Sequence, residues 1–307
     1  MPEVNPGGVP TLVQLHVTLQ AVRTITWPHY AGSSLRGAFG RALRRAACVT
    51  GQSTCQACPL RTSCAYGVVF DPAAPAQPLH PSFTDGLPLY IVQPPALGAC
   101  RLSAGQTQTY SLVLLPGSQS HHRLIEHVLK AATAQELHTP GSYRLHSITS
   151  QATQVTALPT EVLTQPNKPA HTTLRWQTPL RIQQQGKPIF NPQQLDAGLL
   201  VRAILRRRAQ WHQITGQAAP DNNPALQAAS ACQLDTRKLE WHHMQRYSST
   251  QNQHLPLIGF IGSASLTGPA QALHTLQPLL KLGEQLHIGK ETAMGLGRYQ
   301  LGELQTG

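Results

Sequence analysis

The sequence predicts an α+β protein of two tandem domains, and three observations support this prediction. The chain has 307 residues, more than the roughly 100 to 200 residues of a usual single domain. Segments with strand and helix periodicity follow one another in the order strand, helix, strand, strand, helix, strand. This order occurs once in each half of the chain. Two split β-α-β units of this kind predict tandem ferredoxin-like domains.

The first cycle begins at residues 11–20, where apolar and polar residues alternate as in a half-buried strand. Apolar residues then recur at helical spacing from Leu35, and Ser33 or Ser34 is expected to cap this helix. The remaining elements of the cycle are extended segments at 89–92 and 110–115, a helix at 125–134 and a strand at 142–148.

The second cycle begins with a strand at residues 172–176 and a turn at Thr178-Pro179. It continues with a helix at 192–211, extended segments at 239–247 and 256–264, a helix at 269–282, and a terminal hairpin of 286–290 and 297–301. Proline, asparagine and threonine accumulate near residues 158–169, where apolar periodicity fades, and a second loop is expected at 221–224. We therefore expect one domain at 1–160 and another at 161–307.

The composition of the chain is strongly basic. It holds 24 Lys and Arg residues against 13 Asp and Glu, a net charge of +11, and 18 of the 24 basic residues are arginine. Because a planar guanidinium suits phosphate groups and stacks on bases, this excess favours a nucleic-acid partner. The alternative is a GC-rich genome in which arginine replaces lysine for codon reasons, and composition alone leaves both open.

No apolar run approaches the roughly 18 to 20 residues that a membrane span needs. Residues 1–10 also lack the basic flank and apolar core of a secretion signal. We therefore expect a cytoplasmic protein with no membrane partner.

Four of the six cysteines form the pattern Cys-x6-Cys-x2-Cys-x5-Cys at Cys48, Cys55, Cys58 and Cys64. In a reducing compartment this spacing favours a metal site over disulfides, so we expect residues 48–64 to be a Cys-rich insertion that could hold a structural zinc ion. An iron–sulfur cluster uses the same ligands, and reduced cysteines can also pack as small apolar residues. Cys100 and Cys232 stand alone.

A glycine-rich segment near the end of the chain carries Gly289, Gly295 and Gly297 between Lys290 and Arg298. Glycine permits positive φ and lets backbone N–H groups approach a phosphate, while the two cations would add charge-assisted contacts. The alternative is a tight hairpin that needs glycine for its turn alone.

Several motifs resemble one known family. They are Gly289-Lys-x-Thr-x-Met-Gly-Leu-Gly-Arg-Tyr299, Leu35-Arg-Gly-Ala-Phe-Gly-Arg-Ala-Leu-Arg-Arg45, Cys55-x2-Cys-Pro-Leu-Arg-x2-Cys64-x-Tyr66, Thr178-Pro-Leu-Arg181, and Trp241 followed by Arg246, Ser248 and Gly259-Phe-x-Gly262. In this order they are similar to the CRISPR repeat-RNA-processing endoribonucleases of the RAMP superfamily.

The resemblance implies tandem ferredoxin-like (RRM-like) domains that grip a CRISPR repeat stem-loop and cut the precursor RNA at its base. The family's reaction needs no metal: the 2′-hydroxyl attacks the adjacent phosphate, which leaves a 2′,3′-cyclic phosphate. It further implies that the mature crRNA stays bound and that other subunits of a CRISPR ribonucleoprotein are partners. Two alternatives are a catalytically silent crRNA-binding subunit and an RNA-binding protein unrelated to CRISPR.

Two candidate sets could perform the cleavage. In the resembled family the catalytic residue, often histidine, lies in or just before the first helix, where this chain has His29 beside Tyr30. A histidine could act as base or acid, and Tyr30 could position the 2′-hydroxyl. Alternatively, Arg23 and Arg36 could orient the scissile phosphate and stabilise the phosphorane without a strong base.

Further residues are candidate RNA contacts, and for the four arginines of the helix at 192–211 a solvated basic face is the alternative. Tyr30 is one of these candidates. The others lie on the helices expected from Leu35 and at 192–211, in the segment 239–247 and in the glycine-rich segment: Arg41, Arg44, Arg45, Arg202, Arg206, Arg207, Arg208, Arg246, Gly289, Lys290, Gly295, Gly297 and Arg298.

Overall fold

Alternating apolar side chains build the first long strand, β1 (Thr11–Ala21), in which Leu15, Val17 and Leu19 are fully buried. The structure is a computed structural model that describes residues 10–135, 141–155, 167–248 and 253–306. It has two units: unit 1 holds residues 1–155, 213–217 and 246–255, and unit 2 holds 156–212, 218–245 and 256–307. The expected boundary between residues 160 and 161 lies in the segment 156–166, outside the described residues.

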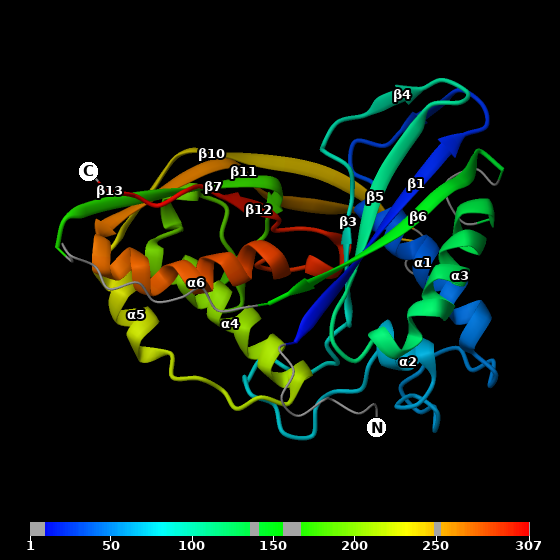
Figure 1. Cartoon of the computed structure of the whole chain (residues 1–307), viewed down its shortest axis with the longest axis horizontal. Helices are drawn as coiled ribbons and strands as arrows, with labels where there is room; N and C mark the ends of the chain where they lie inside the picture. Colours follow the sequence, from blue (N-terminus) through cyan, green and yellow to red (C-terminus); the bar gives the residue numbers. More distant parts are fainter. Residues whose placement is uncertain (1–9, 136–140, 156–166, 249–252, 307) are drawn as a thin grey trace. The chain divides into compact units, whose positions relative to one another are not determined.

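Unit 1 contains a four-stranded antiparallel sheet in the order β3-β5-β1-β6. Its other strands are β3 (Tyr90–Gln93), β5 (Thr107–Leu114) and β6 (Tyr143–Gln154), and β1 pairs with both β5 and β6. Helices α1 (Gly32–Ala47) and α3 (His122–Gln135) pack against each other beside this sheet (Figure 1). The short helix α2 (Ala65–Val69) and the strand pair β2 (Ile25–Trp27) and β4 (Cys100–Leu102) complete the unit.

Unit 2 repeats this arrangement with a sheet in the order β10-β11-β7-β12. The strands are β7 (Pro169–Leu180), β10 (Gln233–Ser248), β11 (Gln253–Pro269) and β12 (Tyr299–Leu301), and β13 (Gln305–Thr306) also pairs with β7. In both units the second, third, first and fourth strands of the cycle lie in that order. This is the ferredoxin-like topology, so the predicted α+β class and tandem fold are confirmed.

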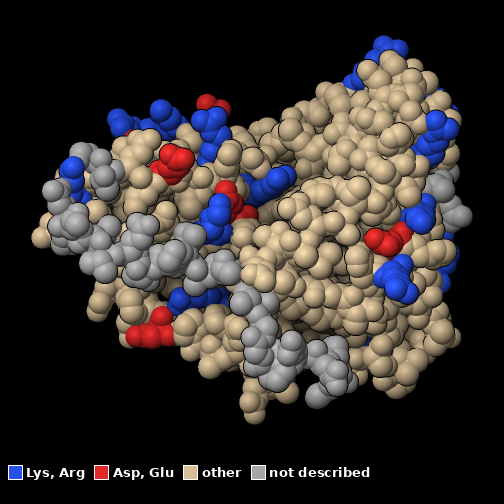
Figure 2. Space-filling view, in the orientation of Figure 1, with Lys and Arg blue, Asp and Glu red and all other residues tan. Residues whose placement is uncertain are grey.

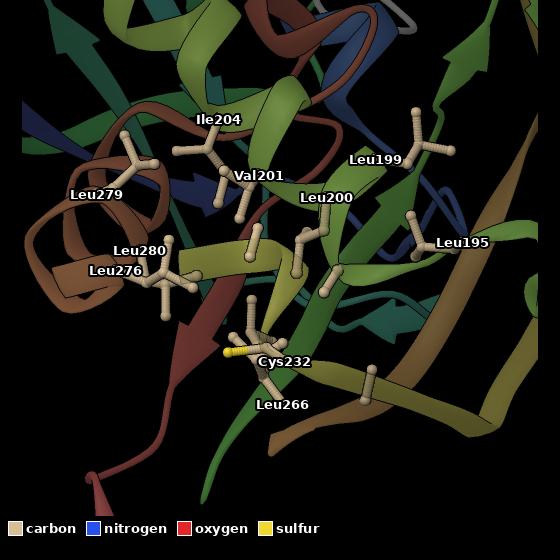
Figure 3. Packing of buried hydrophobic residues seen from close by; sticks show 14 of the residues in the cluster. Leu195, Leu199, Leu200, Val201, Ile204, Cys232, Leu266, Leu276, Leu279 and Leu280 are labelled. Carbon is tan, nitrogen blue, oxygen red and sulfur yellow. The ribbon is translucent and has the colours of Figure 1, made fainter. Parts of the chain in front are cut away.

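Helices α4 (Ala197–Thr215) and α6 (Ala270–Leu286) bury their apolar faces in the core of unit 2. Figure 3 shows side chains of both helices, among them Val201, Ile204 and Leu280, gathered near Leu266 of the sheet. Full burial of each such side chain stabilises the fold by about 1.5 to 3 kcal/mol. No helix in the described parts of the chain is long and apolar enough to cross a membrane.

Four local predictions were wrong. Helix α1 begins at Gly32 after an Ala31 N-cap, so Ser33 and Ser34 lie inside its first turn and do not cap it. Thr178-Pro179 is no turn, because β7 continues to Leu180. The helix expected from Pro192 is interrupted: a 3-10 turn, η2 (Pro192–Gln194), precedes α4.

The fourth concerns the expected terminal hairpin. Leu286 is the last residue of α6, and residues 287–290 form no strand. Strand β12 instead pairs with β7 through Tyr299 and Trp176. Helix α5 (Asn223–Ser230) and the small pair β8 (Gln183–Gln184) and β9 (Lys187–Pro188) were not predicted.

Candidate functional site

The guanidinium of Arg36 is held on an aromatic stack in unit 1. Its central carbon lies 4.7 Å from the centroid of the Phe70 ring. Phe70 is itself stacked between Tyr66 at 5.1 Å and Tyr90 at 5.3 Å, with interplanar angles of 21° and 15°. A cation–π contact of this kind is worth about 0.5 to 2 kcal/mol. The stack therefore limits the positions that the Arg36 charge can take.

Burial raises the pKa of Tyr90 well above its usual range, and the nearby charge of Arg36 opposes this shift only in part. Tyr90 is thus neutral near pH 7 and serves as an aromatic support. Gly40 makes the stack possible, because a Cβ at this position would lie 2.3 Å from the Phe70 ring.

Arg23 follows the end of β1 and donates hydrogen bonds from Nε and a terminal nitrogen to Ser142 Oγ, at 3.3 and 3.0 Å. Its side chain is otherwise exposed, so one edge of the guanidinium is fixed by the protein. His29 is also exposed, in the turn before α1, and its carbonyl oxygen accepts a hydrogen bond from Gly98 N at 3.0 Å. Arg23 and His29 therefore lie before α1, on either side of β2.

Tyr30 is largely buried, next to the start of α1. Only 9% of the residue is exposed, so most of its ring packs in the core of unit 1. Its predicted role in positioning the 2′-hydroxyl stays a prediction.

The remaining basic residues of α1 divide into two kinds. Arg41 and Arg45 are exposed. Arg44 is engaged with the cysteine-containing loop, because it donates to Ser53 O at 2.9 Å and to Gln52 O, and its guanidinium lies 5.8 Å from the Tyr66 ring. Arg44 thus links the helix to the loop and is less available to RNA than predicted.

The four clustered cysteines line one small cavity of about 20 Å³, together with Val49 and Leu60; they are Cys48, Cys55, Cys58 and Cys64. Thr50 Oγ1 lies 3.8 Å from Cys48 Sγ and 3.6 Å from Cys58 Sγ, while Cys64 Sγ donates to Ala47 O at 3.6 Å. Hydrogen bonds from the Gly51 and Thr50 region lower the pKa of Cys48. Among the described residues, no group of three or more His, Cys, Asp or Glu is arranged so that it could hold a metal ion.

A larger cavity of about 530 Å³ adjoins this loop in unit 1. It is lined by cations and by acids, including Arg61, Asp71 and Asp85. Arg61 is paired with Asp71 at 3.1 Å and also donates to Pro72 O at 3.0 Å. The mixed charge makes this cavity a poor phosphate site.

The glycine-rich segment in unit 2 is folded closely against β7. Gly289, Gly295 and Gly297 all have positive φ. A Cβ on Gly297 would lie 1.7 Å from Ile288 O, and one on Gly289 would lie 2.3 Å from Arg181 O. Gly289 and Gly297 are therefore required by close backbone approach within the unit.

Backbone N–H groups of this segment are also used inside unit 2. Lys290 N donates to Arg181 O at 2.8 Å, and Gly297 N donates to Pro179 O at 2.9 Å. The expectation that these N–H groups bind phosphate must be corrected. What the segment offers to an anion are the half-buried side chains of Lys290 and Arg298.

Thr178 is a residue of this region whose role the sequence did not reveal. Its buried hydroxyl donates to Gly295 O at 2.7 Å and accepts from Arg298 N at 2.9 Å. It thereby fixes the backbone on which Arg298 is carried.

His287 is a second such residue. It is fully buried with a φ of 57°. Burial, followed by the charges of Arg298 and Arg207, lowers the pKa of His287 to about 3. The imidazole is therefore neutral near pH 7.

Two of the four arginines predicted to contact RNA from α4 make hydrogen bonds within unit 2. Arg207 is buried and donates from Nε to Leu286 O at 2.8 Å, so it binds the end of α6. Arg208 donates to Asp221 O at 3.1 Å and to Asn222 Oδ1 at 2.5 Å. Arg202 remains exposed and Arg206 half-buried, four residues apart on one face. Arg246 lies on β10, but its side chain is outside the described residues.

Figure 2 shows that Lys and Arg side chains on the viewed face lie in several separate groups. RNA contacts would therefore be distributed over distinct points of each unit.

Two family models match the chain. Residues 9–174, more than half of it, match a model described as an N-terminal domain. Residues 174–299 match the model of the CRISPR-associated endoribonuclease Cas6. No curated protein matches the chain in sequence.

Solved structures show the same fold at low sequence identity. Thermus thermophilus Cas6 is 16% identical with a TM-score of 0.55, over 96% of this chain and 100% of that one. A Cas6 product complex is 18% identical with a TM-score of 0.56, over 95% and 99%. A partial Cas6-RT-Cas1–Cas2 complex is 16% identical with a TM-score of 0.57, over 98% of this chain, which spans 48% of the length of that one.

Proposed function

Since the chain belongs to the CRISPR-associated endoribonuclease Cas6 family of the RAMP superfamily, we propose that it cleaves CRISPR precursor RNA at the base of the repeat stem-loop. The observation that carries the proposal is the family match over residues 174–299. The ferredoxin-like topology of both units supports it.

The proposed reaction is an attack of the ribose 2′-hydroxyl oxygen on the adjacent phosphorus. A new P–O2′ bond forms while the P–O5′ bond breaks, which yields a 2′,3′-cyclic phosphate and a 5′-hydroxyl. One group must accept the 2′-hydroxyl proton and another must supply a proton to the leaving oxygen. The step needs no metal, provided that cations stabilise the phosphorane.

We assign the phosphate-stabilising role to Arg36 and Arg23. An arginine stays protonated near neutral pH, so it orients and stabilises but removes no proton. The contact of Arg36 with Phe70 and the bonds from Arg23 to Ser142 support this assignment, because a charge already in place needs less reorganisation during the reaction. The exposed His29 is the candidate for proton transfer.

For RNA binding we propose cations whose side chains are exposed or half-buried. These are Arg41, Arg45, Arg202, Arg206, Lys290 and Arg298, with Arg246 as predicted from sequence. Because side chains cannot enter the deep major groove of A-form RNA, they would contact phosphates and 2′-hydroxyls.

We also propose that the four clustered cysteines bind one structural zinc ion, or an iron–sulfur cluster with the same ligands. Their common cavity supports this, although the thiols would have to move to bring four sulfurs to the Zn–S distance of about 2.3 Å. The ion would fix the loop that Arg44 holds, and it would take no part in cleavage.

Retention of the product and assembly with other subunits belong to the same proposal. One similar structure is a partial Cas6-RT-Cas1–Cas2 complex, and another is a Cas6 product complex. By analogy, the mature crRNA stem-loop and further CRISPR proteins are the proposed partners of this chain.

The test is incubation of the protein with repeat RNA in the presence of EDTA. We expect a product that ends in a 2′,3′-cyclic phosphate. Arg36→Ala should slow cleavage by about 10²- to 10³-fold, the usual effect of removing one transition-state donor. Arg237→Ala is the control, because Arg237 is an exposed arginine of unit 2 paired with Asp235.

The alternative function is a catalytically silent crRNA-binding subunit. Tight binding of intact repeat RNA under all conditions would support it. Unchanged cleavage by both His29→Ala and the double variant Arg23→Ala/Arg36→Ala would refute the site assignment while leaving the enzyme intact.

A further inference from the structure

Two aromatic side chains of unit 2 lie exposed against each other. Phe190 has 57% of its surface exposed and Trp241 38%. Their ring centroids are 5.1 Å apart in an edge-to-face arrangement, at 62°. Among the large exposed hydrophobic residues of the described chain they are the two aromatic ones.

The pair is anchored to the core rather than loosely attached. The ring centroid of Trp241 lies 5.3 Å from that of the fully buried Phe260. The two rings are again edge to face, with an interplanar angle of 61°. The three aromatic rings are thus in contact one after another, from Phe260 in the core of unit 2 through Trp241 to Phe190 at the surface. Edge-to-face contacts add about 0.5 to 1.5 kcal/mol each beyond burial, so the outer rings keep a defined orientation.

The backbone on either side of Phe190 is also fixed. Ile189 before it is buried, and its N–H donates to Ile182 O at 3.2 Å. Asn191 after it caps η2 by accepting from Gln193 N at 3.0 Å. Phe190 is therefore exposed between two residues that are held by packing and hydrogen bonds.

The surroundings of the pair are polar. The exposed neighbours are Gln184, Lys187, Asn191, Gln193 and Gln194. A stable protein interface needs roughly 1,000 Å² or more of buried surface with an apolar centre. Two rings in a polar surrounding are too small for that, but they match the size of a nucleobase.

We propose that Phe190 and Trp241 form a stacking platform for an unpaired base of the bound RNA. This inference rests on the proposed RNA substrate and adds a base contact to it. Aromatic side chains bind single-stranded RNA by stacking on its bases, without need of a particular sequence. Lys187, three residues before Phe190 and exposed, could meet the neighbouring phosphate.

The chain offers a direct optical test. It has four tryptophans, of which Trp27, Trp176 and Trp211 are buried at 2%, 3% and 5% exposure. Stacking of a base should therefore quench the fluorescence of Trp241 selectively. Titration of the full chain with single-stranded hexa-adenylate should give saturable quenching, and an abasic strand of the same length should give much less.

Variants separate the platform from general effects. Phe190→Ala should weaken hexa-adenylate binding, measured by fluorescence anisotropy of a labelled strand, by about 5- to 100-fold. Trp241→Phe should keep binding and lose the quenching signal, since a ring still contacts Phe260. Arg237→Ala should change neither.

Unquenched fluorescence together with unchanged affinity of Phe190→Ala would overturn the platform. If repeat RNA is cleaved in EDTA while this result is obtained, the proposed function stands and this inference alone fails. If repeat RNA is neither bound nor cleaved, the proposed function fails as well.

Discussion

At the scale of single residues, Gly37 and Gly40 of α1 predict opposite effects of the same substitution. Gly40→Ala would place a methyl group 2.3 Å from the Phe70 ring, whereas Gly37→Ala would meet only the end of the Arg41 side chain at 3.2 Å. Gly40→Ala should therefore destabilise the protein by about 1 to 3 kcal/mol. Gly37→Ala should stabilise it by about 0.5 to 1 kcal/mol, because alanine favours helix.

Urea denaturation measures both changes in the free energy of unfolding. Because Phe70 supports Arg36, Gly40→Ala should also slow cleavage of repeat RNA at temperatures where the variant is folded. Equal stability of the two variants would show that the stack is not packed as described.

The buried His287 predicts a specific dependence of stability on pH. Its pKa is lowered to about 3 in the folded state, while an unfolded histidine titrates near 6.5. Between these values the unfolded state binds one more proton, so stability is full above about pH 6.5 and falls by up to about 1.4 kcal/mol per pH unit as pH drops toward 3.

His287→Asn is the matched variant, because its amide side chain is polar and does not titrate in this range. The difference in unfolding free energy between the two proteins, measured at several pH values, should show the slope assigned to His287. Parallel pH profiles would contradict the burial of a neutral imidazole.

At the scale of elements, we predict that the cysteine-containing loop after α1 binds a metal ion. Its thiols share one cavity, so four thiolates could close a tetrahedral zinc site. Protein grown with zinc should carry one equivalent by elemental analysis, and chelation should lower Tm. Cys58→Ser should lose the metal.

Cys100→Ser provides the control, since Cys100 is exposed and lies outside this loop. It should retain the full equivalent. A metal-free wild type after purification without chelator, with no zinc uptake on titration, would refute the site and leave the cysteines as packing residues.

The elements also show what periodicity can predict. The order of strands and helices in both units followed from apolar patterns, because each element buries one face. The terminal hairpin failed because its glycines were interpreted as a local turn, whereas Tyr299 pairs with Trp176 on the distant strand β7. Pairing between segments so far apart leaves no local trace in the sequence.

The candidate site was predictable to a similar extent. Arg23 and Arg36 were identified as cations near the first helix, but the rings that hold Arg36 are dispersed over α2 and β3, so spacing could not join them. Arg207 was expected to contact RNA with its neighbours. Its burial depends on the end of α6, which sequence periodicity in α4 cannot reveal.

At the scale of the whole molecule, the net charge of +11 bears on what happens after cleavage. Each phosphate contact adds binding energy that depends on salt, with log K falling in proportion to the number of contacts. A product that keeps all contacts of the stem-loop should dissociate slowly at low salt. We therefore expect each molecule to cleave once and then to remain bound to the crRNA.

Cleavage with a tenfold excess of repeat RNA measures this. At low salt the product should reach a plateau at one equivalent of enzyme, while higher salt should raise the amount by releasing the product. Arg202→Ala should remove one phosphate contact. The slope of log K against the logarithm of the salt concentration should then become smaller in magnitude by roughly 0.7 to 0.9. Several turnovers at low salt would show that the stem-loop leaves freely, and the protein would then act as a dissociating processing enzyme. The proposed retention of the crRNA stem-loop in a larger assembly would then be wrong.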